Sequence, residues 1–135
     1  MRLVLVTLII VLCMCGCSRT YTEQDFADSK WNDSNGAIIE LSKNGTCNVR
    51  DINWASIYPT SWISDSIWKE EHPQSFLGHW AIKLNRHGEQ EINIQIEKTG
   101  HGFSFGIKNI NTIERIIGDP DDCNYYKFTR ICYSQ

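Results

Sequence analysis

The cysteines are the residues of this chain most able to do chemistry, and three of the six lie close together as Cys13, Cys15 and Cys17. A thiol can ligate a metal, form a disulfide or carry a covalent group. Zinc sites use C-x-x-C pairs, whereas the spacing here is C-x-C-x-C. The pattern therefore disfavours a metal site and directs attention to the segment around these thiols.

That segment has the layout of an export signal, because a basic start, Met1-Arg2, precedes the apolar run "LVLVTLIIVL" at 3–12. A ten-residue helix reaches about 15 Å, half of a bilayer core, so a spanning helix is not expected. The next residues, Met14-Cys15-Gly16-Cys17, resemble the bacterial lipobox, in which a small residue precedes the cysteine that is acylated. An ordinary secretory signal without lipid is the alternative.

The lipobox resemblance implies that Cys17 carries the lipid and that the membrane is the first partner. It divides the chain into a signal peptide (1–16), a lipidated N-terminus with a polar tether (17–30) and one domain (31–135). Ser18 rather than Asp follows the cysteine, which in Gram-negative lipoproteins implies the outer rather than the inner membrane. The expected location is the bacterial cell envelope.

Charge and length limit the other partners. The chain carries 13 Lys and Arg against 16 Asp and Glu, a formal net charge of −3. No basic run or face is present in the sequence, which argues against a nucleic-acid partner. The length suits one domain with a single core.

Three cysteines remain beyond the signal region: Cys47, Cys123 and Cys132. In an oxidising compartment an odd number allows one bridge and one free thiol. Cys123 and Cys132 flank one predicted strand and would lie roughly 30 Å apart, beyond disulfide reach. A bridge would therefore join Cys47 to Cys132 or to Cys123; three reduced thiols are the alternative.

Period-two alternation predicts the elements that position these groups. "EINIQIE" (91–97), "HWAIKLN" (79–85), "FSFGIK" (103–108) and "YYKFTRIC" (125–132) each place apolar residues on one face, including Cys132 in the last. Residues 36–52 predict two more strands around Lys43-Asn44-Gly45, where Asn-Gly favours a hairpin turn. We expect an all-β fold, an antiparallel meander closed into a small barrel or folded as a sandwich.

One excursion, 53–76, is too long for a hairpin loop. Within it "SDSIWKEEH" (64–72) predicts a short helix that ends before Pro73. Four large rings lie in or beside it, and either plug a barrel end or contact a ligand, glycan or protein. These residues are Trp54, Tyr58, Trp62 and Trp68.

Three stretches carry a resemblance that covers roughly 31–132 without the excursion. "GAIIELSKNGTC" (36–47), "GHWAIKL" (78–84) and "IGDPDDCNYYKFTR" (117–130) resemble a pattern in uncharacterised bacterial lipoproteins and secreted proteins. The resemblance implies a lipocalin-like small barrel and brings no catalytic residues. Cys47 and Cys123 depart from it, which makes any disulfide peculiar to this chain.

Other clusters give weaker indications of chemistry. Asp119, Asp121, Asp122 and Asn124 could offer oxygen ligands to Ca²⁺, but the following glycine and distant glutamate of a calcium loop are absent. We interpret them as a turn, with Arg130 returning to pair with one aspartate. Ser61, Ser64 and Ser66 precede His72 without a nucleophile elbow. We therefore expect no metal, no cofactor and no enzyme activity.

The sequence as a whole predicts a lipid-anchored envelope protein whose small barrel is a binding or interaction module. Its partner would be a protein or a small apolar ligand. The many aromatic residues favour a filled interior, so binding would use the outside or the excursion. The alternative is an envelope inhibitor or immunity protein against a toxin or cell-wall enzyme.

Overall fold

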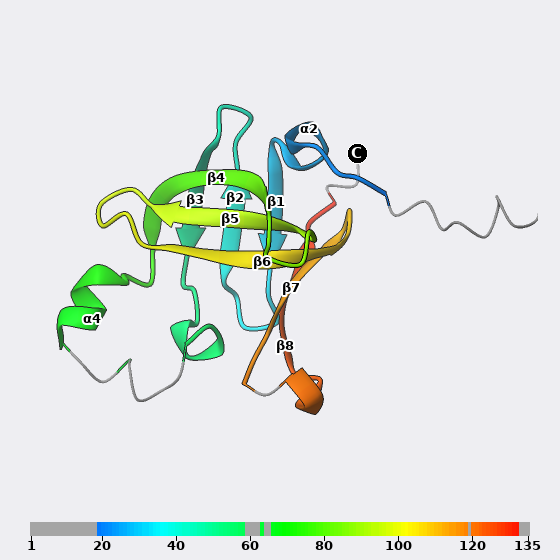
Figure 1. Ribbon diagram of the computed structural model, residues 1–135. Helices are drawn as coiled ribbons and strands as arrows, with labels where there is room; N and C mark the ends of the chain where they lie inside the picture. The colour runs from blue at the N-terminus through cyan, green and yellow to red at the C-terminus, as the bar shows by residue number, and fades with distance from the viewer. Residues whose placement is uncertain (1–18, 59–62, 64–65, 119, 133–135) are drawn as a thin grey trace, which may run out of the picture.

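The structure, a computed structural model, describes residues 19–58, 63, 66–118 and 120–132 (Figure 1). Its strands run as an antiparallel meander, and the last pairs with the first to close a barrel. The strands are β1 (Ser29–Asn32), β2 (Ile38–Leu41), β3 (Thr46–Arg50), β4 (Phe76–Leu84), β5 (Gln90–Ile96), β6 (Gly102–Asn109), β7 (Thr112–Ile116) and β8 (Tyr125–Arg130). The helical elements are α2 (Glu23–Phe26), η1 (Trp54–Ser56), α4 (Ser66–Glu71) and η2 (Pro120–Asp122).

The expected all-β fold is confirmed as a small lipocalin-like barrel, and the sandwich alternative is excluded. Closure comes from Trp31 and Asn32 of β1, which lie opposite Arg130 and Thr129 of β8. A closed sheet leaves no free edge strand at the β1–β8 junction. The strands expected from alternation are present, whereas β1 and β7 were not predicted.

Alternation along each strand separates the core from solvent. In β5, Ile92, Ile94 and Ile96 are fully buried, while Gln95 between them is exposed. Large apolar side chains fill the interior of the described barrel. Its largest fully buried members are Trp31, Phe26, Phe105, Phe128, Ile39, Leu41, Ile52, Ile92, Ile94, Ile96, Ile113 and Val49.

Gly78 allows β3, β4 and β5 to approach closely. It lies opposite Cys47 of β3 and Ile96 of β5. A Cβ atom at this position would overlap the carbonyl oxygen of Gln95 and lie 3.3 Å from the Sγ of Cys47. Two residues on, Trp80 is buried and its Nε1 donates to the carbonyl of Ser42 at 2.8 Å. The Gly-x-Trp stretch thus serves packing.

Residues from Tyr21 onward, within the stretch expected as a polar tether at 17–30, contact the barrel. The amide of Tyr21 donates to Gln90 Oε1 at 2.7 Å, and Gln90 Nε2 donates back to the carbonyl of Tyr21 at 2.8 Å. α2 follows, with Phe26 fully buried. An apolar residue at this one position turns an otherwise polar segment into a cap on the barrel.

Arg130 closes the same end of the barrel, where its described contacts are with Trp31, Asp25 and Ile110. Its guanidinium lies 5.8 Å from the ring centroid of Trp31, which in turn stacks on Phe26. Its Nη1 donates to the carbonyl of Asp25 at 3.0 Å. Arg130 therefore joins the last strand to the segment that precedes the first.

The excursion lies at the opposite end (Figure 1). The predicted helix is confirmed as α4, and η1 adds a 3-10 turn that was not predicted. Asn53 begins η1 by accepting a hydrogen bond from the amide of Ala55. Among the described residues no helix has the length and apolar character needed to cross a bilayer.

Candidate binding surfaces

Trp54, the first of the four expected contact residues, is part of the core. It is 5% exposed, and its ring lies 5.1 Å from that of Phe103 and 6.0 Å from that of Phe76, centroid to centroid. Its Nε1 donates to the carbonyl of Pro73 at 3.1 Å. The indole ring and its polar atom therefore make their contacts within the molecule.

Tyr58 and Trp68 extend this packing outward and are half-buried. Trp68 stacks on His72 with a centroid separation of 4.0 Å, and Tyr58 meets Trp68 edge-on at 5.8 Å. Trp62 lies outside the described residues. The aromatic cluster, as we call this group, plugs the end of the barrel and consists of Trp54, Tyr58, Trp68, His72, Phe76 and Phe103.

The aromatic cluster also covers a seam in the barrel wall. The register between β6 and β7 ends at Gly106 opposite Glu114. Before that point the carbonyls of β6 are met by side chains: Tyr58 Oη donates to Gly102 at 3.4 Å and Arg115 Nη1 donates to Ser104 at 3.0 Å. Tyr58 of the excursion and Arg115 of β7 thus supply hydrogen bonds where strand pairing stops.

Asp33 and Tyr126 form a buried polar pair that sequence reasoning missed. Tyr126 Oη donates to Asp33 Oδ2 at 3.0 Å and accepts from the amide of Asn53 at 3.2 Å. Asp33 Oδ1 accepts from the amides of Asn35 and Ala37. Burial, with the adjacent Asp33 carboxylate, raises the pKa of Tyr126 despite the hydrogen bond from Asn53. The pair fixes the β1–β2 turn to the start of the excursion.

The three described cysteines are free thiols, and the bridge considered between Cys47 and Cys132 is not formed in this structure. Cys47 is 2% exposed inside the barrel, and burial raises the pKa of its thiol to about 12. Cys132 lies beyond the end of β8 and is exposed, contrary to its expected place on the inner face. Cys123 is also exposed, with a left-handed backbone at φ 52°.

The clusters considered for catalysis or metal binding are not assembled among the described residues. His72 is buried in the aromatic cluster, where its Nδ1 lies 2.9 Å from the carbonyl of Trp68. Ser61, Ser64 and Asp119 lie outside the described residues. In the part of the chain that the structure describes, no three His, Cys, Asp or Glu side chains gather as a metal site would require.

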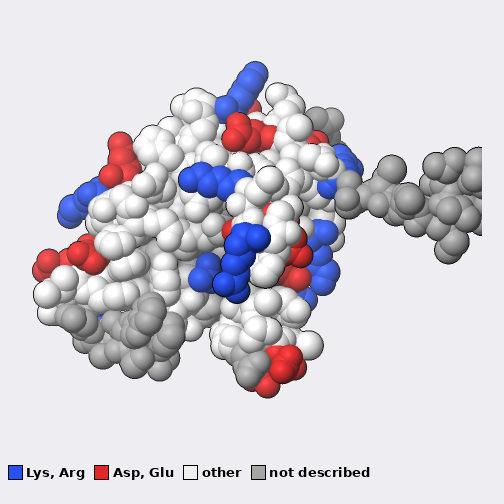
Figure 2. Space-filling model, viewed as in Figure 1, with Lys and Arg blue, Asp and Glu red and all other residues white. Residues whose placement is uncertain are grey.

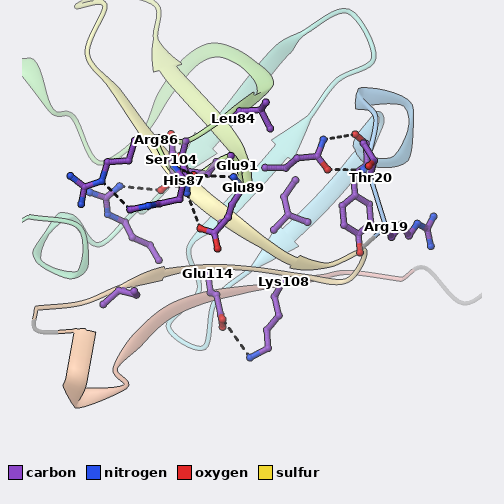
Figure 3. A pocket seen from close by; sticks show the side chains of 18 of the residues that line it. Arg19, Thr20, Leu84, Arg86, His87, Glu89, Glu91, Ser104, Lys108 and Glu114 are labelled. Carbon is purple, nitrogen blue, oxygen red and sulfur yellow. Dashed lines mark hydrogen bonds and ion pairs between the residues drawn. The ribbon is translucent and has the colours of Figure 1, made fainter. Parts of the chain in front are cut away.

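A long outer groove, which sequence reasoning did not predict, hollows the outside of the barrel beside the N-terminal segment (Figure 3). Its volume is about 1150 Å³, just above the range of about 300–1,000 Å³ usual for small-molecule pockets. Five segments meet there: residues 19–21, 84–91, 104 with 106–108, 114–116 and Tyr125. An open groove of this size suits an extended surface better than an enclosed small molecule.

The outer groove mixes charges of both signs (Figures 2 and 3). The β4–β5 hairpin contributes Arg86 and Glu89, and β6 and β7 contribute Lys108 and Glu114. Lys108 Nζ lies 3.4 Å from Glu114 Oε1. Because these residues come from the β4–β5 turn and from two further strands, no local motif marks the groove in the sequence.

Comparison of this chain with protein-family models, curated proteins and solved structures gave no match. The assignment of function therefore depends on the sequence features and on the geometry described above.

Proposed function

We propose that this chain is a lipoprotein of the bacterial cell envelope, acylated at Cys17, whose barrel acts as a binding or interaction module. The basic start, the apolar run and the Gly16-Cys17 pair support acylation. Ser18 at the following position supports the outer membrane in a Gram-negative cell. The resemblance to lipocalin-like bacterial lipoproteins agrees with acylation.

The main observation that supports binding on the outside of the molecule is the filled interior. Phe105 and Phe128 are fully buried in the barrel, and the aromatic cluster around Trp54 closes one end. A small barrel filled by side chains has no room for an internal ligand. The module therefore binds with its outer surface, where the groove lies.

Intact mass measurement of protein extracted from the membrane of a bacterial expression host tests the anchor. We expect a chain that begins at Cys17 and carries the mass of acyl groups. Cys17→Ser should abolish acylation, while the neighbouring Cys15→Ser should leave it unchanged. A wild-type chain that begins elsewhere and carries no lipid would refute the anchor.

A further inference from the structure

Few residues separate the proposed lipid site, Cys17, from the first described contact with the barrel domain. Arg19 already contacts the domain, since its guanidinium lies 5.2 Å from the ring of Tyr21 and 3.5 Å from Asp25 Oδ1. Tyr21 is held to β5 by its two hydrogen bonds with Gln90. Consecutive Cα atoms are about 3.8 Å apart, so Cys17 lies at most about 7–8 Å from Arg19. A lipid at Cys17 therefore holds the domain close to the bilayer.

The outer groove, which Arg19 lines, carries exposed apolar side chains. Leu84 is 68% exposed, Ile116 45% and Tyr125 38%, and all three line the outer groove together with Arg19. Ile116 and Tyr125 lie opposite each other in β7 and β8, and Leu84 at the end of β4 lines the same groove. Exposed apolar side chains around one groove are typical of a protein or membrane contact. Tyrosine in particular favours the interface between hydrocarbon and water.

The same face is more basic than the rest of the chain. The outer groove is lined by four cationic side chains against three carboxylates, although the chain has a net charge of −3. One carboxylate, Glu114, is paired with Lys108 at 3.4 Å and with Lys127 at 3.9 Å. The cations lining the groove are Arg19, Arg86, Lys108 and Arg115. Figure 2 shows a basic side chain where the N-terminal segment leaves the barrel.

We propose that this face lies on the headgroups of anionic phospholipids, so that the barrel rests on the membrane with its outer groove towards the bilayer. The inference depends on acylation at Cys17, because the short connection supplies the constraint. Leu84, Ile116 and Tyr125 then contact the interfacial region, and Arg86 and Lys108 contact lipid phosphates. The aromatic-cluster end, with Ile67 and Leu77 exposed, is left for contacts away from the membrane.

The test uses the acylated protein in vesicles of equal parts phosphatidylcholine and phosphatidylglycerol. Cys123→Ser and Cys132→Ser remove the exposed thiols, and a fluorophore is then attached at Leu84→Cys or Leu77→Cys. These leucines form a matched pair, since both are in β4 and they are 68% and 62% exposed. A spin label on the lipid headgroup should quench the fluorophore at position 84 more strongly than at position 77.

Charge removal supplies the second arm. The double variant Arg86→Gln, Lys108→Gln should make the quenching at positions 84 and 77 equal. Each cation near an anionic surface changes the equilibrium constant for binding to that surface about fivefold. Lys43→Gln with Lys98→Gln, exposed lysines outside the groove, should leave the difference intact. Equal quenching in acylated wild-type protein would overturn this orientation alone. Absence of the acyl mass would overturn the proposed anchor and the orientation with it.

Discussion

The aromatic cluster and the outer groove differ in what their large side chains do. In the cluster, Trp54 is 5% exposed and meets four aromatic rings and a histidine. In the groove, Leu84 is 68% exposed and belongs to an open surface. The region rich in tryptophan thus stabilises the barrel, and the region without tryptophan is the one available for contacts.

This difference shows that aromatic content alone does not identify a contact surface. An indole buries a large area, and its contribution is greatest where packing removes it from water. The excursion uses that area to close a barrel end. The outer groove, assembled from chain segments far apart in sequence, leaves smaller apolar groups in solvent beside basic ones.

The largest expected effect is the loss of stability on removing the cluster's central ring. Trp54→Ala should lower the free energy of unfolding by about 3–5 kcal/mol, because it deletes a buried indole and leaves a cavity. Denaturant unfolding measures this change. Leu84→Ala in the groove should change stability by less than about 0.5 kcal/mol. Similar effects of the two substitutions would contradict the contrast between the regions.

A smaller effect is expected from the polar pair that joins the excursion to the barrel. Tyr126→Phe removes the hydroxyl that bridges Asp33 and the amide of Asn53. It should lower stability by about 1–3 kcal/mol, since it leaves buried polar atoms with one partner fewer. The control is Tyr125→Phe, the neighbouring exposed tyrosine of β8. Equal unfolding midpoints for the two variants would show that the pair contributes nothing.

The smallest effect concerns the thiols and appears only in alkali. The folded Cys47 thiol, with a pKa of about 12, keeps its proton when the unfolded thiol, with an ordinary value near 9, has lost it. Unfolding then releases a proton, so the free energy of unfolding falls as pH rises above 9. At pH 10 it should be about 1.4 kcal/mol lower than at pH values well below 9. Stability curves from pH 8 to about pH 10 measure this fall.

Two variants separate this thiol from the other groups that titrate in alkali. Cys47→Ala should flatten the fall, whereas Cys123→Ala, at an exposed thiol, should retain it. Alkylation after denaturation without reduction should modify Cys47, Cys123 and Cys132. Modification of Cys123 alone or of Cys132 alone would instead show that Cys47 is in a disulfide, and would contradict a buried free thiol at that position.

Much of the barrel was predictable because its longer strands have one buried face and one face in solvent. β5 alternates Ile92, Ile94 and Ile96 with polar residues, and only a strand with one buried face produces that pattern. α4 was predictable from the polar helix formers before Pro73. These signals are local, so no tertiary contact was needed to recognise them.

β1 and β7 were missed for a physical reason. β1 has four residues and β7 five, too few for alternation to stand out from a loop. β7 also places Arg115 on the same side as Ile113, where its guanidinium reaches Ser104 across the seam. The positions of β1 and β7 are fixed by hydrogen-bonded pairing with a neighbouring strand on each side. The sequence of one segment does not encode that pairing.

The sequence by itself determined the strand class, the period-two core faces, the helix before Pro73 and the proposed lipid site at Cys17. Each depends on neighbours within a few residues. Only the tertiary structure decided which rings are buried, which residues Arg130 contacts and where the outer groove lies. Those features join residues far apart in sequence, such as Tyr21 with Gln90 and Arg130 with Trp31. Closure of the barrel brings them together, and local sequence carries no record of that closure.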